Sequence, residues 1–375
     1  MLVRPLLLLL LLASSGLVHA QMGDSRLLRH FRISSKDTTT LNRRQLTFFP
    51  VVYRSPETGT AFGTLALGLF KMIGVKDQAT RTSNLEMPII YTMKRQFVVD
   101  LLYNLITNKE RFFIRGVNVY NQSSEFFFGV GNHTPENNRT QVDYNMLRST
   151  QRVTARINGR HFLGLQYQYF KMWKTHFEKG IPPPADLPGH NGFETSGAGF
   201  VYLYDSRDNV INSSKGAYLD ISNYFFGRSI GSNYSFNNVI IDGRKFYSVG
   251  KKQVLALQAV FQYNEGNVPW RQLANMGGFN MMRGFYQGRH RDRDYVAAQV
   301  EYRFPVWKYL GMTVFAATGE VEHSIGDFSL RELKLSGGTG IRVQVDKKER
   351  VNIRFDMGFT SRGLTGFYVN IGEAF

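Results

Sequence analysis

Alternation of apolar and polar residues along the chain predicts membrane-spanning β-strands. The clearest segment is 350–360. Its alternate positions are apolar: Val351, Ile353, Phe355, Met357 and Phe359. A strand of a transmembrane β-barrel alternates in this way over about ten residues, with apolar side chains toward lipid and polar ones toward the lumen. We therefore expect the apolar set to face lipid and Arg354 and Asp356 to face the lumen.

The same alternation recurs between turn signals and predicts sixteen strands. They are 46–53, 60–72, 82–94, 96–107, 111–121, 139–157, 160–177, 193–206, 215–227, 233–247, 252–265, 292–304, 309–321, 334–346, 349–361 and 364–375. In the middle and C-terminal parts, short turns alternate with long loops, as in bacterial barrels with periplasmic turns and extracellular loops. The predicted fold class is all-β, an antiparallel transmembrane barrel. Fourteen strands is the alternative, because the N-terminal third is less regular.

The N-terminal residues have the pattern of an export signal. Arg4 precedes a leucine run at 6–12, and Val18-His19-Ala20 predicts cleavage before Gln21. The apolar run is too short for a spanning helix, which needs about 20 apolar residues. We expect a signal peptide at 1–20, a short periplasmic segment at 21–45 and a barrel at 46–375, in the bacterial outer membrane.

Composition narrows the possible partners. The 375-residue chain has no cysteine, so disulfides do not hold it together. Its formal charge of +17 comes from scattered Lys and Arg. Scattered charge favours solvated loops, lumen lining and contacts to anionic lipid headgroups over nucleic acid. We expect a monomeric barrel whose partner is outer-membrane lipid, with no nucleic acid.

No pattern typical of a catalytic or metal site stands out. His161 and His176 fall on one predicted strand, but neither has the relation to a serine that a Ser–His hydrolase needs. Carboxylates and histidines do not cluster at ligand spacing. We therefore expect that the protein is not an enzyme and that it binds no cofactor and no metal.

Three segments of the C-terminal half carry a family resemblance. They are Tyr204-Asp205-Ser206-Arg207-Asp208-Asn209 with Gly216, Met282-Arg283-Gly284-Phe285, and Phe315-Ala316-Ala317-Thr318-Gly319-Glu320-Val321. Together they resemble the BamA/TamA superfamily of outer-membrane barrels, or bacterial surface antigen family, over residues 195–375. The resemblance implies that the first segment is a periplasmic turn and that the 266–291 loop folds into the barrel.

A loop arginine that leaves bulk water needs an acidic partner. Relatives usually supply an aspartate at the place of Ala317, so this chain departs from the pattern. Strand parity turns Glu301 and Asp356 toward the lumen, with Arg342 on the strand between them. We expect Arg283 to lie within hydrogen-bonding reach of Glu301 or Asp356.

The end of the chain also fits the resemblance. Phe367, Val369 and Ile371 share one face before Phe375, the pattern of a terminal strand that the assembly machinery reads. Glu373 interrupts that face. We expect it at the periplasmic rim, where a charge costs about 0–1 kcal/mol.

The beginning of the chain departs from most relatives. Residues 21–45 are too few for a periplasmic POTRA domain, and 48–63 looks like the barrel start of short, POTRA-less members. Because relatives use those domains to capture clients or lipoprotein partners, the resemblance implies the barrel more directly than the activity. The expected function is assembly, insertion or translocation of outer-membrane proteins, with nascent barrels or a periplasmic lipoprotein as partners. The alternative is a passive channel or a membrane anchor for a separate complex.

Overall fold

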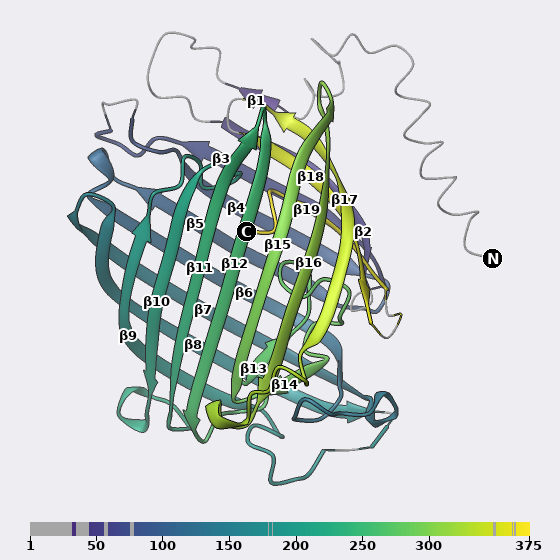
Figure 1. Cartoon of the computed structure of the whole chain (residues 1–375). Helices are drawn as coiled ribbons and strands as arrows, with labels where there is room; N and C mark the ends of the chain where they lie inside the picture. Colours follow the sequence, from purple (N-terminus) through teal and green to yellow (C-terminus); the bar gives the residue numbers. More distant parts are fainter. Residues whose placement is uncertain are drawn as a thin grey trace.

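The computed structural model describes residues 32–34, 45–55, 59–75, 79–178, 180–181, 183–347, 350–361, 363 and 365–375. The predicted signal peptide lies outside these residues, as does most of the predicted periplasmic segment. Sixteen long strands make up the described part (Figure 1). They are β2 (Gln45–Ser55), β3 (Gly59–Phe70), β4 (Ser83–Thr92), β5 (Phe97–Ile106), β6 (Phe112–Phe127), β7 (Thr140–Asn158), β8 (His161–Glu178), β9 (Phe193–Asp205), β10 (Gly216–Phe226), β11 (Phe236–Gly250), β12 (Gln253–Gly266), β15 (Asp294–Trp307), β16 (Leu310–Glu322), β17 (Lys334–Asp346), β18 (Val351–Thr360) and β19 (Thr365–Ile371).

The remaining elements are short. Three-residue strands β1 (Arg32–Ser34), β13 (Ala274–Met276) and β14 (His290–Asp292) accompany four single 3-10 turns. These are η1 (Asn108–Glu110), η2 (Glu136–Asn138), η3 (Arg228–Ile230) and η4 (Ile325–Asp327). No helix in the described part of the chain is long and apolar enough to cross a membrane.

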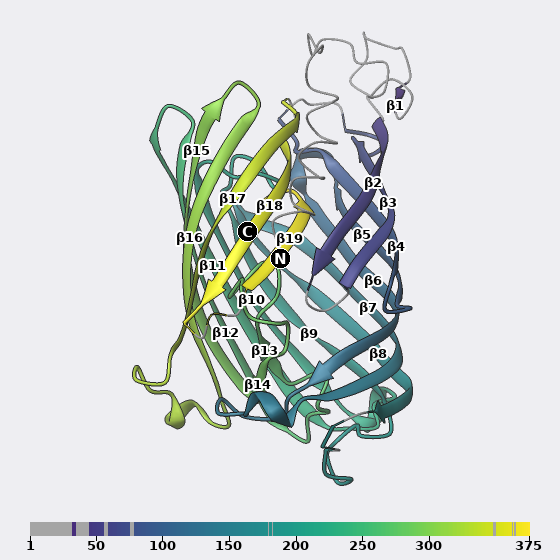
Figure 2. The same cartoon turned by 90° about the vertical axis from the view of Figure 1, so that its right-hand side faces the viewer.

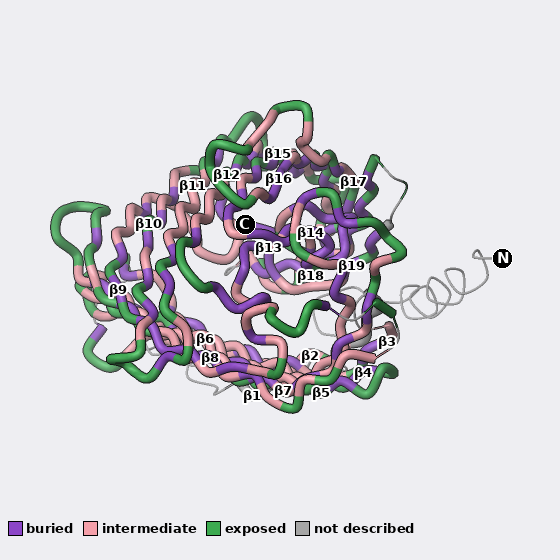
Figure 3. Tube along the Cα trace, turned by 90° about the horizontal axis from the view of Figure 1, so that it is seen from below, coloured by how far each residue is buried: buried purple, intermediate pink, exposed green. Residues whose placement is uncertain are grey.

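The long strands pair antiparallel with their neighbours in chain order, with β12 followed directly by β15. The sheet curls round a lumen, as the view along it shows (Figure 3). This confirms the predicted all-β fold and its sixteen strands. The β7–β8, β9–β10, β11–β12, β15–β16 and β17–β18 connections lie around the same end of the barrel, toward the top of Figure 1.

Alternation sets which side chains face inward. On β18, the side chains of Met357 and Phe359 are 37% and 46% exposed on the outer wall, whereas Arg354 and Asp356 are buried. Outward apolar side chains suit a hydrocarbon environment, and inward polar ones find partners in the lumen. The sequence pattern of this strand therefore gives the register directly.

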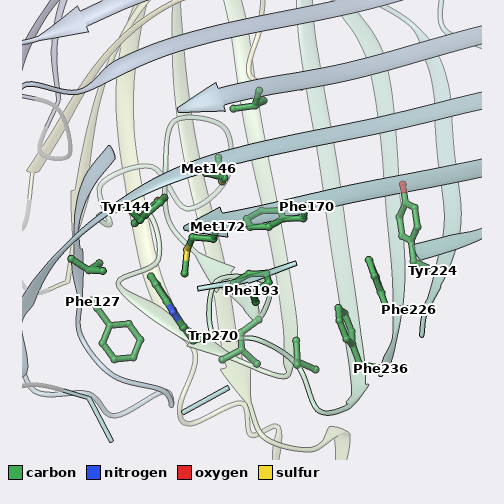
Figure 4. Close-up of a cluster of buried hydrophobic side chains, with 14 residues drawn as sticks. Phe127, Tyr144, Met146, Phe170, Met172, Phe193, Tyr224, Phe226, Phe236 and Trp270 are labelled. Atoms are coloured by element: carbon green, nitrogen blue, oxygen red, sulfur yellow. The ribbon is translucent and has the colours of Figure 1, made fainter. Parts of the chain in front are cut away.

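An aromatic cluster fills the lumen near the long loops (Figure 4). Fully buried Trp270 lies at its centre, with edge-to-face ring contacts to Phe127 and Tyr144 at centroid distances of 5.2 and 6.4 Å. Phe170 and Phe193 stack beside them at 5.1 Å. Because these rings come from β6, β7, β8, β9 and the segment after β12, the cluster holds that segment inside the barrel.

The last predicted strand is shorter than expected. The sequence predicts 364–375, but β19 ends at Ile371. Gly372 has a φ of +83°, which favours glycine, and its N–H donates to the carbonyl of Asn352 at 2.8 Å. The chain therefore bends away from the wall, and Ala374 and Phe375 are buried. Figure 3 shows the C-terminus inside the ring of strands.

Candidate functional site

The segment between β12 and β15 folds back into the barrel; we call residues 267–293 the lumen loop. Its two ends form the β13–β14 pair, in which Ala274 lies opposite Asp292. The Arg271 guanidinium lies 3.2 Å from Glu125 of β6. The loop is thus attached to the opposite wall near its start.

Arg283 is the central charge of the lumen loop, and its side chain is completely buried. One terminal nitrogen lies 2.6 Å from Glu301 of β15, and the other lies 2.6 Å from Asp356 of β18. Both carboxylates are also fully buried. A charge-assisted hydrogen bond on each nitrogen offsets the cost of removing the guanidinium from water. The structure thus places both predicted candidates beside Arg283.

Glycines let the loop backbone touch the wall. A Cβ added to Gly358 of β18 would lie 2.6 Å from the carbonyl carbon of Arg283. Gly284 has a φ of +112°, and its N–H donates to the Tyr368 hydroxyl of β19 at 3.1 Å. That hydroxyl donates in turn to the Phe285 carbonyl at 3.3 Å. The loop motif therefore contacts the last strand directly.

The third motif segment supplies packing instead of charge. The Arg283 guanidinium lies 3.5 Å from the centre of the Phe315 ring on β16. Ala317, where relatives carry aspartate, is buried in an apolar cluster with Met282 and Phe285. Arg283 pairs instead with Asp356 of β18 and Glu301 of β15. It therefore has two carboxylate partners without an aspartate on β16.

Arg342 extends the network toward the end of the chain. Its guanidinium lies 2.6 Å from Asp356, 2.7 Å from Glu373 and 3.6 Å from Glu301. The amide of Asn352 also donates to Glu373 at 2.7 Å. Glu373 thus lies at the end of the barrel that holds the β17–β18 connection, as expected, but it is buried in an ion-pair network, so the low cost expected for a charge at the rim does not apply. The bend at Gly372 turns its side chain, which is 1% exposed, into the lumen.

Two further arginines complete the network. Arg303 lies 2.7 Å from Glu301 and donates to the Phe375 carbonyl at 3.1 Å. Arg354 lies 3.2 Å from Asp356 and donates to the Asn280 side-chain oxygen at 2.8 Å. The phenyl ring of Phe375 packs on Phe246 of β11 at 6.1 Å, inside the lumen.

Sequence reasoning did not name Glu373 as a member of this network, nor Tyr368, Arg303, Asn280 and Asn352. Parity on β19 does point Tyr368 inward. The sequence did contain a signal for a bend at this point: Glu373 follows the apolar residues Phe367, Val369 and Ile371 at alternate positions.

Side chains of the 205–216 turn accept hydrogen bonds from N–H groups of the same turn. Asp205 accepts hydrogen bonds from the backbone and side chain of Arg207 at 3.0–3.1 Å, and it lies 2.7 Å from Arg81. Asn209 accepts from the N–H groups of Ile211 and Asn212 at 2.8 and 2.7 Å. These bonds satisfy backbone donors that a short turn leaves without partners.

Asp208 ties this turn to the β17–β18 connection. Its carboxylate accepts from the N–H groups of Ser214 and Lys215 and lies 2.6 Å from Arg350. Gly216 has a φ of +107° and begins β10. A Cβ added to Gly372, just after β19, would lie 3.7 Å from Ile211. The turn therefore lies beside the bend that follows β19.

The pH response of Asp208 is a first prediction. Burial raises the pKa of Asp208, but hydrogen bonds from Ser214 and Arg350 outweigh it and lower the pKa to about 2. Because the folded pKa lies below its ordinary value, this carboxylate stabilises the turn above pH 3.8. The contribution is lost as the pH falls through about 2. An NMR titration in micelles should show this midpoint, and Arg350→Gln should raise it. A wild-type midpoint at 3.8 would contradict the assignment.

A second prediction concerns the glycine contact. Gly358→Val should displace the lumen loop, because its side chain would collide with the Arg283 backbone, at a cost of about 1–3 kcal/mol. External protease added to intact cells should then cleave within 267–293. Gly243→Val is the matched control, since a Cβ there meets its nearest atom at 3.9 Å. Equal resistance of both variants would show that the loop is not seated on β18.

The described residues hold no group of three or more His, Asp or Glu side chains able to bind a metal ion. Ion pairs and packing hold the lumen loop against the barrel wall.

A sixteen-stranded barrel with an arginine-anchored loop in its lumen is the class of protein that the fold and site define. Residues 77–375 match the Omp85 superfamily domain, so the chain belongs to this superfamily. The match confirms the resemblance.

Solved structures of low identity share the fold. BamA from Haemophilus ducreyi, crystallised without POTRA domains 1–3, aligns with a TM-score of 0.56 and 14% identity over 92% of this chain and 75% of that one. CdiB from Acinetobacter baumannii gives a TM-score of 0.55 with 12% identity, over 87% of this chain. CdiB from Escherichia coli gives 0.56 with 9% identity, over 86% of this chain. This chain spans 60% of each CdiB chain. A search of curated proteins finds no match.

Proposed function

We propose that this protein is an exported outer-membrane barrel that inserts or translocates other outer-membrane proteins, using the meeting edges of its first and last long strands. Membership of the Omp85 superfamily and the fold shared with BamA and CdiB support an insertion or translocation role. Nascent outer-membrane proteins would be its substrates, and a periplasmic lipoprotein would be its partner. Chemistry by side chains is not required for this function.

The observation that carries the proposal is the edge between β2 and β19, which we call the seam. Cα atoms of the two strands come within 8 Å of each other, on the side that Figure 2 turns to the viewer. No residue-by-residue register joins their described residues, whereas β2 shares eleven pairs with β3 and β18 shares seven with β19. A strand edge that is weakly joined to its neighbour is a template for adding a further strand.

The lumen loop is placed to control this seam. Its motif bonds to Tyr368 of β19, and its arginine shares the carboxylate of Asp356 with Arg342, which in turn pairs with Glu373. Moving the loop would therefore release its bond to Tyr368 of β19 and one of the partners of Asp356. This connects the site to the edge at which a client strand would pair.

A disulfide across the seam tests the proposal. The natural chain has no cysteine, so introduced pairs are the only thiols. One cysteine placed at 48–52 of β2 and one at 366–370 of β19 should, when oxidised, stop insertion of a model barrel into vesicles, and reductant should restore it. The control pair Met357→Cys and Phe367→Cys joins register partners of β18 and β19 and leaves the seam free. Full insertion with an oxidised seam would refute the mechanism.

Depletion of the protein separates the candidate functions. An insertion factor should lower several unrelated outer-membrane barrels together and copurify with nascent ones. A membrane anchor should lose one stable partner and leave the rest unaltered. A change only in small-solute permeability would favour a passive channel.

A further inference from the structure

The 205–216 turn between β9 and β10 contacts two distant parts of the barrel at the end that lies toward the top of Figure 1. On one side, Asp205 lies 2.7 Å from Arg81, which precedes β4. On the other side, Asp208 lies 2.6 Å from Arg350, which precedes β18. The side chain of Asn212 also donates to the Arg350 carbonyl at 3.3 Å. The turn therefore joins the N-terminal and C-terminal parts of the wall.

The strand order shows how far apart these two parts are along the wall. Five steps between neighbouring strands separate β4 from β9, and five more separate β10 from β17. Neighbouring strands lie about 4.8 Å apart, so each path along the rim measures roughly 24 Å. One short turn cannot follow the rim for that length in both directions. Its contacts therefore cross the mouth of the lumen, and we call residues 205–216 the cap.

Hydrogen bonds within the cap hold it in one conformation. The carboxylate of Asp208 accepts from the N–H group of Lys215 at 3.1 Å. The hydroxyl of Ser213, a residue that is 2% exposed, donates to the carbonyl of Asn209 at 2.7 Å. These bonds tie the two halves of the turn together. The cap therefore stays in one piece, and the mouth opens only when the cap loses contacts with other parts of the barrel.

The two attachments of the cap differ in burial. The side chains of Asp205 and Arg81 are 3% and 16% exposed, and Arg207 also pairs with Asp205 at 3.0 Å. The side chains of Asp208 and Arg350 are 13% and 42% exposed. An ion pair that solvent reaches is weak, and salt screens it. The contact with Arg350 should therefore break before the contact with Arg81.

The lumen continues beneath the cap. The Arg81 guanidinium lies 4.8 Å from the ring centre of Phe113, an inward residue near the start of β6. Arg115 follows two positions deeper on the same face, with the opposite parity to the outward residue Tyr120. Arg115 is exposed although it faces inward. The lumen at this level therefore has room for solvent.

We infer that the cap closes this mouth of the lumen and that the mouth opens when the Asp208–Arg350 ion pair breaks. The closed cap separates the lumen from the compartment at this end, which the sequence predicts to be the periplasm. The open cap admits hydrophilic molecules from that side. The first motif segment thereby gains a role, because its Asp205 and Asp208 supply the two attachments. The inference does not depend on the seam or on insertion of other proteins, since an anchor or a channel could carry the same cap.

Labelling of a single cysteine beneath the cap tests the inference. Arg115→Cys introduces the only thiol, because the natural chain has no cysteine. A maleimide joined to a polyethylene glycol chain is added to isolated outer membranes, where both ends of the barrel are accessible. Arg350→Gln removes the exposed attachment. Lys215→Gln is the matched control, because it removes a positive charge from an exposed position of the same turn.

The expected result is faster labelling when the exposed attachment is lost. Arg350→Gln should raise the labelling rate at position 115 about two- to fivefold, as for the loss of a partly exposed ion pair. Arg350→Lys should restore most of the original rate, and Lys215→Gln should leave it unchanged. High salt should raise the rate of the barrel with an unaltered cap, but not the rate of Arg350→Gln.

Migration of the folded band on gels reports whether each variant remains a barrel. Equal rates for Arg350→Gln and Lys215→Gln would overturn the inference. So would the absence of a salt effect with an unaltered cap, a measurement that decides the question even if Arg350→Gln does not fold. In intact cells the reagent reaches only the end with the long loops. Labelling of intact cells at the same rate would show entry from that end and would also overturn the inference.

Discussion

Replacing Arg283 by alanine is expected to lower the free energy of unfolding of the barrel by about 3–5 kcal/mol. The physical reason is that removing one partner of a buried ion pair leaves the opposite charges buried without that partner. Glu301 and Asp356, both fully buried, would each lose a charge-assisted hydrogen bond of 2.6 Å. The Phe315 ring would also lose the guanidinium packed over it. Unfolding in denaturant from lipid vesicles, or heat resistance of the folded band on gels, measures the effect.

Arg228→Ala is the matched control for this loss, because Arg228 is an exposed loop arginine at the end of β10. Its unfolding free energy should change by no more than about 0.5 kcal/mol. If Arg283→Ala behaves like Arg228→Ala, the arginine does not hold the lumen loop. Access of external protease to the loop should rise only in the Arg283 variant.

Replacing Glu373 by alanine is expected to cost about 3 kcal/mol, because a buried network would lose one of its carboxylates. Arg342 and Asn352 would each lose a partner at 2.7 Å. A carboxylate at an exposed rim would instead cost about 0–1 kcal/mol to carry, so its removal would be close to neutral. The same unfolding measurement separates the two possibilities.

Glu265→Ala provides the rim comparison, since Glu265 is an exposed carboxylate near the end of β12. The double variant Arg283→Ala with Glu373→Ala tests whether the two residues act as one unit. Its loss should differ from the sum of the single losses by about 0.5–3 kcal/mol. Additive losses would show that the lumen loop and the chain after β19 are energetically independent.

The sequence alone determined the wall of this barrel. Side chains of a strand alternate between its faces, so a strand with lipid on one side and a polar lumen on the other must alternate in polarity. On β18 this fixed the register, with Phe359 outside and Asp356 inside. Parity also narrowed the partners of Arg283 to carboxylates that face the lumen. The register of β18 and the set of partners for Arg283 both follow from the alternation of side chains along single strands.

Only the tertiary structure decided which side chains pair with one another inside the lumen. Parity says that Glu301, Arg342 and Asp356 face inward, but not which of them meet a loop that comes from elsewhere in the chain. That Arg283 takes both carboxylates follows from where Gly284 and Gly358 let two backbones touch. The inward bend at Gly372 likewise buries Glu373 in the ion-pair network, which the sequence did not predict. A period of two describes an extended chain; it cannot report the residue at which the chain leaves the sheet.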